Sequence, residues 1–120
     1  MTTTIQIVIE TLLRRLGARG TGKGFWSMVR GVELALEDRT RLTQVSKLLY
    51  PLIAADCGMD PRNMVRDMRT LVKLCWEQGD RALLEQVAGR RLVGCPSVGE
   101  FMDYMCGYLR RQGHGLKETK

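Results

Sequence analysis

Residues that build metal sites and catalytic centres are scarce in this 120-residue sequence. It contains a single histidine, His114, and its four cysteines lie far apart, at positions 57, 75, 95 and 106. Zinc sites need several closely spaced ligands, and a nucleophilic residue needs a base beside it. We therefore expect no metal, no cofactor and no catalytic residue, and we interpret the chain as a protein that is not an enzyme.

Long apolar segments and strand patterns are also nearly absent. No apolar run reaches the roughly 18 residues that a membrane-spanning helix needs. The first four residues carry no basic side chain, so nothing there resembles a secretion signal. Alternation of apolar and polar residues is limited to 3–9, and it runs directly into a segment with helical spacing. We expect an all-α, cytoplasmic protein with no membrane partner.

The composition is that of a folded protein with an excess of positive charge. Hydrophobic residues make up 44% of the chain and charged residues 27%, which argues against disorder. Nineteen lysines and arginines against thirteen acidic residues give a net charge of +6. Such an excess on a small protein favours an acidic partner, most often nucleic acid, although basic solvated surfaces are also common.

The apolar periodicity predicts a compact six-helix domain that spans 1–120. The helices cover about 10–16, 25–38, 42–53, 61–78, 80–88 and 97–111, and a mobile tail follows over 112–120. We expect Pro51 to bend or interrupt the third helix. Asp60 caps the fourth helix, which starts at Pro61 and ends at Gly79 with a left-handed cap. Both tryptophans and the methionines on the helical faces are predicted to lie in the core.

The third and fourth predicted helices form a helix-turn-helix candidate over about 41–78. Ala54 and Gly58 stand four residues apart, where the motif places a small residue and a glycine that relieves the turn. Alone this spacing is a weak signal, because it occurs often by chance. The fourth helix, about 61–78, would be the recognition helix that enters the major groove of DNA.

A row of cations runs along this predicted recognition helix. They recur at intervals of four, three and four residues, within a stripe about 60° wide, at Arg62, Arg66, Arg69 and Lys73. Apolar residues occupy nearly the opposite side. The helix has two acidic residues, Asp67 and Glu77, and neither lies within the stripe. A merely solvated face would mix both signs more often, so the pattern favours contact with DNA.

The glycine-rich segment 17–24 resembles a nucleotide-binding loop only in part. It has the Gly-x-x-x-x-Gly-Lys spacing, but Gly24 stands where such loops carry the serine or threonine that holds magnesium. A helix precedes it, whereas a nucleotide loop follows a buried strand. We expect no nucleotide hydrolysis here. Lys23 and the amides at the start of the next helix would instead hold a DNA phosphate, with a plain interhelix turn as the equally weighted alternative.

Several short motifs together resemble a known family. They are, in order, Leu16-Gly17, Lys23-Gly24-Phe25, Leu48-Leu49-Tyr50-Pro51, Ile53-Ala54, Arg66, Arg69, Trp76, Gly79, Gly89 and Glu100-Phe101. The sequence is similar over roughly 5–111 to the C-terminal effector domains of the stage-zero sporulation protein A family, response regulators that commit endospore-forming bacteria to sporulation. The resemblance implies a six-helix domain whose third and fourth helices bind boxes with a TGTCGAA-like sequence, often in head-to-tail pairs.

The resemblance also assigns roles to residues of the recognition helix. Arg66 matches a base-reading arginine of the family, and Arg69 matches a second shared basic position. Asn63 stands where the family has a base-contacting arginine, and Val65 where it has a glutamate; asparagine reads adenine, while valine offers only apolar contact. We therefore predict base contacts from Asn63, Arg66 and Arg69. Phosphate contacts are predicted for Lys23, Arg62 and Lys73.

Partners follow from the same resemblance. In the family, the fifth helix and the loop after it face the RNA polymerase sigma subunit; here that segment contains Arg81, Arg90 and Arg91. A homodimer on tandem sites is implied as well. Family members carry a receiver domain ahead of the effector domain, and this chain has no room for one, so we expect either a fragment or a stand-alone relative. The alternative function is a protein-interaction module that modulates a sigma factor or a full-length regulator with little base readout.

Overall fold

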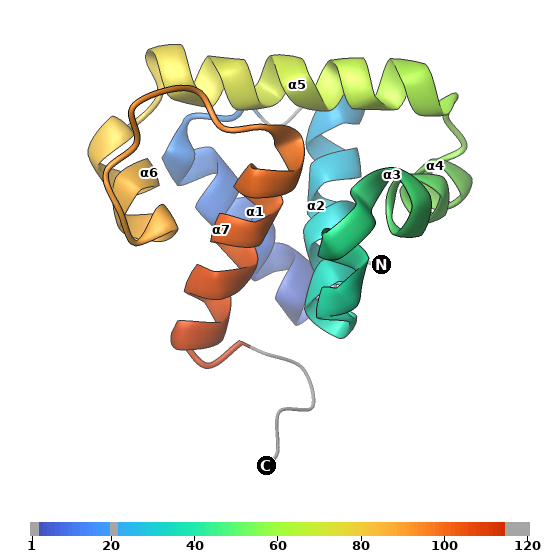
Figure 1. The fold of residues 1–120 in the computed structure, drawn as a ribbon, viewed down its shortest axis with the longest axis horizontal. Coiled ribbons are helices and arrows are strands. Elements are labelled where there is room, and N and C mark those ends of the chain that lie inside the picture. The colour runs from blue at the N-terminus through green and yellow to red at the C-terminus, as the bar shows by residue number, and fades with distance from the viewer. Residues whose placement is uncertain (1–2, 20–21, 115–120) are drawn as a thin grey trace.

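The computed structural model describes residues 3–19 and 22–114, and within these residues it is all-helical, without strands (Figure 1). Its elements are α1 (Thr4–Leu16), α2 (Lys23–Glu37), the 3-10 helix η1 (Arg39–Gln44), α3 (Val45–Leu48), α4 (Tyr50–Cys57), α5 (Pro61–Gln78), α6 (Arg81–Ala88) and α7 (Val98–Arg111). The Cα radius of gyration, 13.2 Å, is close to that of a compact domain of this length.

Side-chain caps start three of the long helices. Thr3 forms a capping box with Gln6, so α1 begins at Thr4 and includes the segment whose alternation is strand-like. The carboxylate of Asp60 accepts hydrogen bonds from the first amides of α5, as predicted. Ser97 forms a second capping box with Glu100 at the start of α7. Local polar signals therefore outweigh a short alternation pattern, because they satisfy amides that a helix start leaves unpaired.

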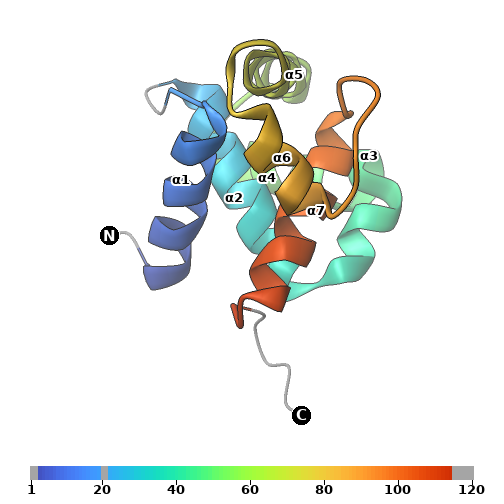
Figure 2. The same cartoon turned by 90° about the vertical axis from the view of Figure 1, so that its left-hand side faces the viewer.

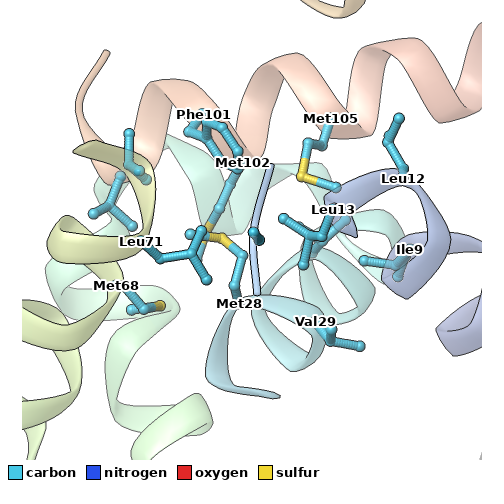
Figure 3. Packing of buried hydrophobic residues seen from close by; sticks show 14 of the residues in the cluster. Ile9, Leu12, Leu13, Met28, Val29, Met68, Leu71, Phe101, Met102 and Met105 are labelled. Atoms are coloured by element: carbon cyan, nitrogen blue, oxygen red, sulfur yellow. The ribbon is translucent and has the colours of Figure 1, made fainter. Parts of the chain in front are cut away.

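The core lies around α2, which packs against α1, α4, α5 and α7. Figure 3 shows Met102 beside the ring of Phe101, Met105 beside Leu13 of α1, and Met28 beside Leu71 of α5. The predicted core methionines are all fully buried, at Met28, Met64, Met68, Met102 and Met105. Flexible, unbranched methionine side chains fill the irregular space between helices that cross at different angles.

The tryptophans do not follow the core prediction in the same way. Trp26 is 44% exposed, and its ring makes an edge contact with Phe25, with the ring centroids 4.9 Å apart. Its placement in the core was wrong, because α2 turns a different set of residues toward its neighbours. Trp76 is half-buried and packs against the core. Its ring is covered by the guanidinium of Arg81, 3.4 Å from the ring centroid.

The predicted third helix is divided into three elements, η1, α3 and α4. The division falls at Leu49, whose φ of −120° and ψ of −52° lie outside helical values, while Pro51 sits in the first turn of α4. Proline has no amide hydrogen to donate four residues back, so it fits the start of a new helix. For this reason the described residues contain seven α-helices and one 3-10 helix, where the periodicity predicted six helices.

Gly79 ends α5 as predicted, but the left-handed cap was wrong. Its φ is −91°, an ordinary value. A Cβ at this position would lie 2.0 Å from the carbonyl oxygen of Leu16, so glycine is needed for a close approach of two chain segments. The left-handed glycine of this contact is its neighbour Gly17, with φ +116°. A left-handed backbone and a close approach both require glycine, and only the tertiary structure shows which of the two applies at a given position.

The C-terminal end of α7 is closed by hydrogen bonds. Gly113 has φ +88° and donates to the carbonyl of Arg110, and His114 donates to the carbonyl of Leu109 at 2.8 Å. Residues 112–114 of the predicted tail are thus bonded to the last turn of α7, and 115–120 lie outside the described residues. No helix in the described part of the chain is long and apolar enough to cross a membrane.

Candidate nucleic-acid interface

Helix α5 lies across one end of the molecule, above α2 and α7 in Figure 1, and a tight turn joins it to α4. Gly58 ends α4 in the left-handed conformation, with φ +64°, and Met59 donates a hydrogen bond to the carbonyl of Ala54 at 3.0 Å. Ala54 is buried, so α4 packs closely at this end. Asp60 then starts α5. The Ala54–Gly58 spacing therefore produces a sharp reversal between two packed helices.

The two faces of α5 have opposite character. One is buried against the core through Met64, Met68, Leu71, Val72 and Cys75. The other carries the four cations of the predicted stripe and Asn63, all of them exposed. Among the described residues, only Arg66 of this stripe has an acidic group within 4.0 Å, the carboxylate of Asp67 at 3.7 Å, and its side chain is 69% exposed. The stripe therefore presents cations to solvent with little internal compensation.

Lys23 lies beside α5 although it is far from it in the sequence. The first turn of α2 meets the middle of α5: a Cβ on Gly24 would lie 2.9 Å from the carbonyl oxygen of Asp67. Lys23 and Asp67 line the same surface groove, of about 290 Å³. Gly24, which disqualifies the segment as a nucleotide loop, is thus required by helix packing. Gly20 and Thr21 of the same segment lie outside the described residues.

A second groove, of about 400 Å³, lies on the other flank of α5, between this helix and the α3–α4 region. Tyr50 and Pro51 line it from one side, and Arg62, Val65 and Arg69 line it from α5. Burial raises the pKa of Tyr50, and the positive charge of Arg69 opposes that shift. Sequence reasoning did not assign Tyr50 and Pro51 to the site; their motif pointed to the family and not to their position beside α5.

A polar network fixes α4 against α1 and α2. Arg30 donates to Asp56 of α4 and to Glu33, both at 2.7 Å, and Gln6 of α1 donates to the same oxygen of Glu33 at 2.8 Å. Burial lowers the pKa of Arg30, but these hydrogen bonds and the two negative charges raise it above its ordinary value overall. The network holds the helix before the turn in place, and hence the direction in which α5 leaves it.

The three arginines predicted to face a sigma subunit are not equivalent. Arg81 covers the ring of Trp76 and donates two hydrogen bonds to its carbonyl oxygen, the shorter at 2.6 Å. Arg90 and Arg91 are exposed at the start of the loop between α6 and α7, and the later part of this loop, from Cys95, approaches α5 (Figure 2). Glu85 holds this loop by accepting a hydrogen bond from the amide of Leu92 at 3.0 Å.

Metal-binding side chains are dispersed, and two of the cysteine thiols are buried, in the part of the chain that the structure describes. No group of three or more metal-binding side chains occurs there. Burial raises the pKa of Cys75 and of Cys106 to about 12, so both thiols stay protonated near neutral pH. The exposed features of the site are cations on a helix, which suit binding to an anionic partner.

Comparison with known families identifies the chain's relatives. The family described as "Sporulation initiation factor Spo0A C terminal" matches residues 9–109, from within α1 to near the end of α7. The match includes the α4–α5 turn, the cation stripe and the α6–α7 loop. The chain therefore belongs to the Spo0A C-terminal family of DNA-binding effector domains from sporulation response regulators.

Proposed function

We propose that this chain is a sequence-specific transcription regulator whose α4 and α5 form a helix-turn-helix, with α5 as the recognition helix in the major groove. The observation that carries the proposal is the exposed, nearly uncompensated stripe of cations on α5, opposite a fully buried face. A row of cations on a helix next to a tight turn suits a groove lined with phosphates, and arginine can donate two hydrogen bonds to the edge of a guanine.

Three side chains contact bases in this proposal, and three contact phosphates. Arg66, Arg69 and Asn63 address base edges, because they are exposed on α5 and have the donor geometry for guanine or adenine. Arg62 and Lys73 extend the stripe toward its two ends. Lys23, beside the middle of α5, is suited to a phosphate on the flank of the groove.

The test is a fluorescence-anisotropy titration of two duplexes at several salt concentrations. One carries tandem TGTCGAA-type boxes, and the other a scrambled sequence of the same composition. A preference of roughly a thousandfold or more supports a specific regulator, and a smaller one points to an altered box. Random-sequence selection then identifies the preferred site. Failure to enrich any sequence contradicts the proposal and leaves the protein-interaction module as the function.

Substitution of Lys73 separates electrostatic from base contacts. Lys73→Ala should weaken boxed and scrambled duplexes alike and reduce the slope of log K against log salt by about one. Arg15→Ala is the matched control, since it removes one exposed cation from α1, away from α5. A loss confined to the boxed duplex would instead make Lys73 a base contact.

A second part of the proposal concerns protein partners. We propose that the α6–α7 loop contacts the sigma subunit of RNA polymerase through Arg90 and Arg91, and that two copies bind tandem boxes as a homodimer. Val93, at 105% relative exposure, lies two residues after Arg91 on the same loop, and an exposed apolar residue close to cations suits a protein partner. Arg81 is instead held against Trp76 of α5. Loss of transcription activation in Arg91→Ala with unchanged DNA affinity is the expected result.

A further inference from the structure

The groove between α5 and the α3–α4 region carries an inference that rests on the proposed function. It lies directly beside the cation stripe, with Arg62 and Arg69 at its α5 edge and Val65 between them. Pro51 and Tyr50 close it from the opposite side. Since neither arginine has an acidic group within 4.0 Å among the described residues, the charge at this edge favours a polyanion over a protein segment.

Val65 lies close to the stripe without belonging to it. It follows Arg62 by three residues and precedes Arg69 by four, which places it about 60° and 40° away from them around the helix. Its side chain is half-buried and packs against the core, so its remaining surface is held in one place. With Arg62 on a phosphate and Arg69 on a base edge, the edge of the neighbouring base would lie on Val65.

The apolar side chains of Val65 and Pro51, which line the groove, discriminate among the four bases. The side chains of Val65 and Pro51 contain only carbon and hydrogen and offer no hydrogen-bond partner. The hydroxyl groups that line the groove, of Ser46 and Tyr50, belong to the α3–α4 side and not to α5. A cytosine amino group or a purine edge placed there would lose its bonds to water without replacement. Thymine is the one base that presents an apolar group, its 5-methyl, in the major groove. We infer that Val65, supported by Pro51, is a specificity-determining residue that selects thymine next to the bases read by the stripe.

The experiment removes the methyl group and nothing else. Each thymine of the duplex obtained by random-sequence selection is replaced singly by deoxyuridine, which keeps every hydrogen bond and phosphate. We expect one thymine in each box whose replacement weakens binding about fourfold, the effect of burying one methyl-sized group. In Val65→Ala the thymine and deoxyuridine duplexes should bind equally. Leu52→Ala, which alters an exposed leucine of α4 outside the groove, should keep the fourfold ratio.

A second variant at Val65 tests the inference by changing which base is preferred. Val65→Glu introduces an acceptor for the amino group of cytosine, so a repeated selection should exchange thymine for cytosine at that one position. The inference is overturned if no thymine replacement matters, or if Val65→Ala keeps the fourfold ratio. Either result with a clearly enriched site leaves the proposed function intact. A wild-type selection that enriches no sequence removes the proposed function, and this inference with it.

Discussion

The arginines of α5 and those of the supporting helices share one chemistry and have opposite uses. Arg66 is largely exposed, and its nearest acidic group is 3.7 Å away. Arg30 instead makes two hydrogen bonds of 2.7 Å to acidic side chains, and Arg81 covers the ring of Trp76. The net charge counts all of them equally. Only cations that the fold leaves without close partners remain available for a nucleic acid, which is a property of tertiary structure.

The largest expected effect is a loss of stability when the hydrogen bonds of Glu33 with Arg30 and Gln6 are removed. Glu33→Ala removes the acceptor shared by Arg30 and Gln6, and Glu33 is 7% exposed. Its loss leaves the Gln6 amide without this acceptor and Arg30 with Asp56 alone, so the free energy of unfolding should fall by about 3 kcal/mol. Urea denaturation measures this. The control is Glu37→Ala, an exposed residue paired with Arg41 at 3.4 Å, which should change stability by no more than about 0.5 kcal/mol. Equal losses of stability in Glu33→Ala and Glu37→Ala would show that the network has no structural role.

The next effect concerns DNA affinity alone. Arg66→Ala should cost about 1–3 kcal/mol of binding free energy on the preferred box and little on a scrambled duplex. Because the side chain is exposed, the free energy of unfolding should change by no more than about 0.5 kcal/mol. Titration and urea denaturation on the same sample measure both quantities. A variant that keeps full box preference would remove Arg66 from the base contacts.

The two buried cysteines should make the stability of the fold depend on pH, unlike the exposed cations of α5. Cys75 and Cys106 are buried, with pKa values of about 12 against an ordinary value of 9.0. Above pH 9 these thiols ionise in the unfolded chain before they do in the folded one, so stability should be full below pH 9 and fall as pH rises toward 12. The loss approaches about 1.4 kcal/mol per pH unit for each thiol. Urea midpoints at pH 8 and pH 10 test this, and Cys106→Ala should reduce the difference; an unchanged difference would argue against it.

The smallest effect tests the stacked arginine. Arg81→Ala removes the cation from the face of Trp76, which should lower stability by about 1 kcal/mol without changing box preference. Tryptophan emission should shift at the same time, since the ring becomes more exposed. Arg90→Ala is the matched control, with neither change expected. A loss of activation in Arg81→Ala at unchanged stability would assign it to the partner surface instead.

Helix α5 shows how far local signals reach. Asp60 and Pro61 mark its start, Gly79 follows its end, and the period of its cations and apolar residues defines two faces, so its bounds and its exposed stripe were predicted from the sequence. The segment 42–53 also has apolar residues at helical spacing, yet it is divided at Leu49. Leu49 is fully buried, and the non-helical backbone at that position directs it into the core. Periodicity counts apolar positions but carries no information on that direction.

The sequence by itself determined the all-helical class, the limits of α5 and the cations along it, because these depend on interactions within a few residues of each other. Tertiary structure alone decided that Lys23 lies beside α5, that Gly24 and Gly79 are needed for close backbone approach, and that Tyr50 and Pro51 form a groove next to the stripe. Those features join residues distant in the chain, and their positions follow from how whole helices pack against the core.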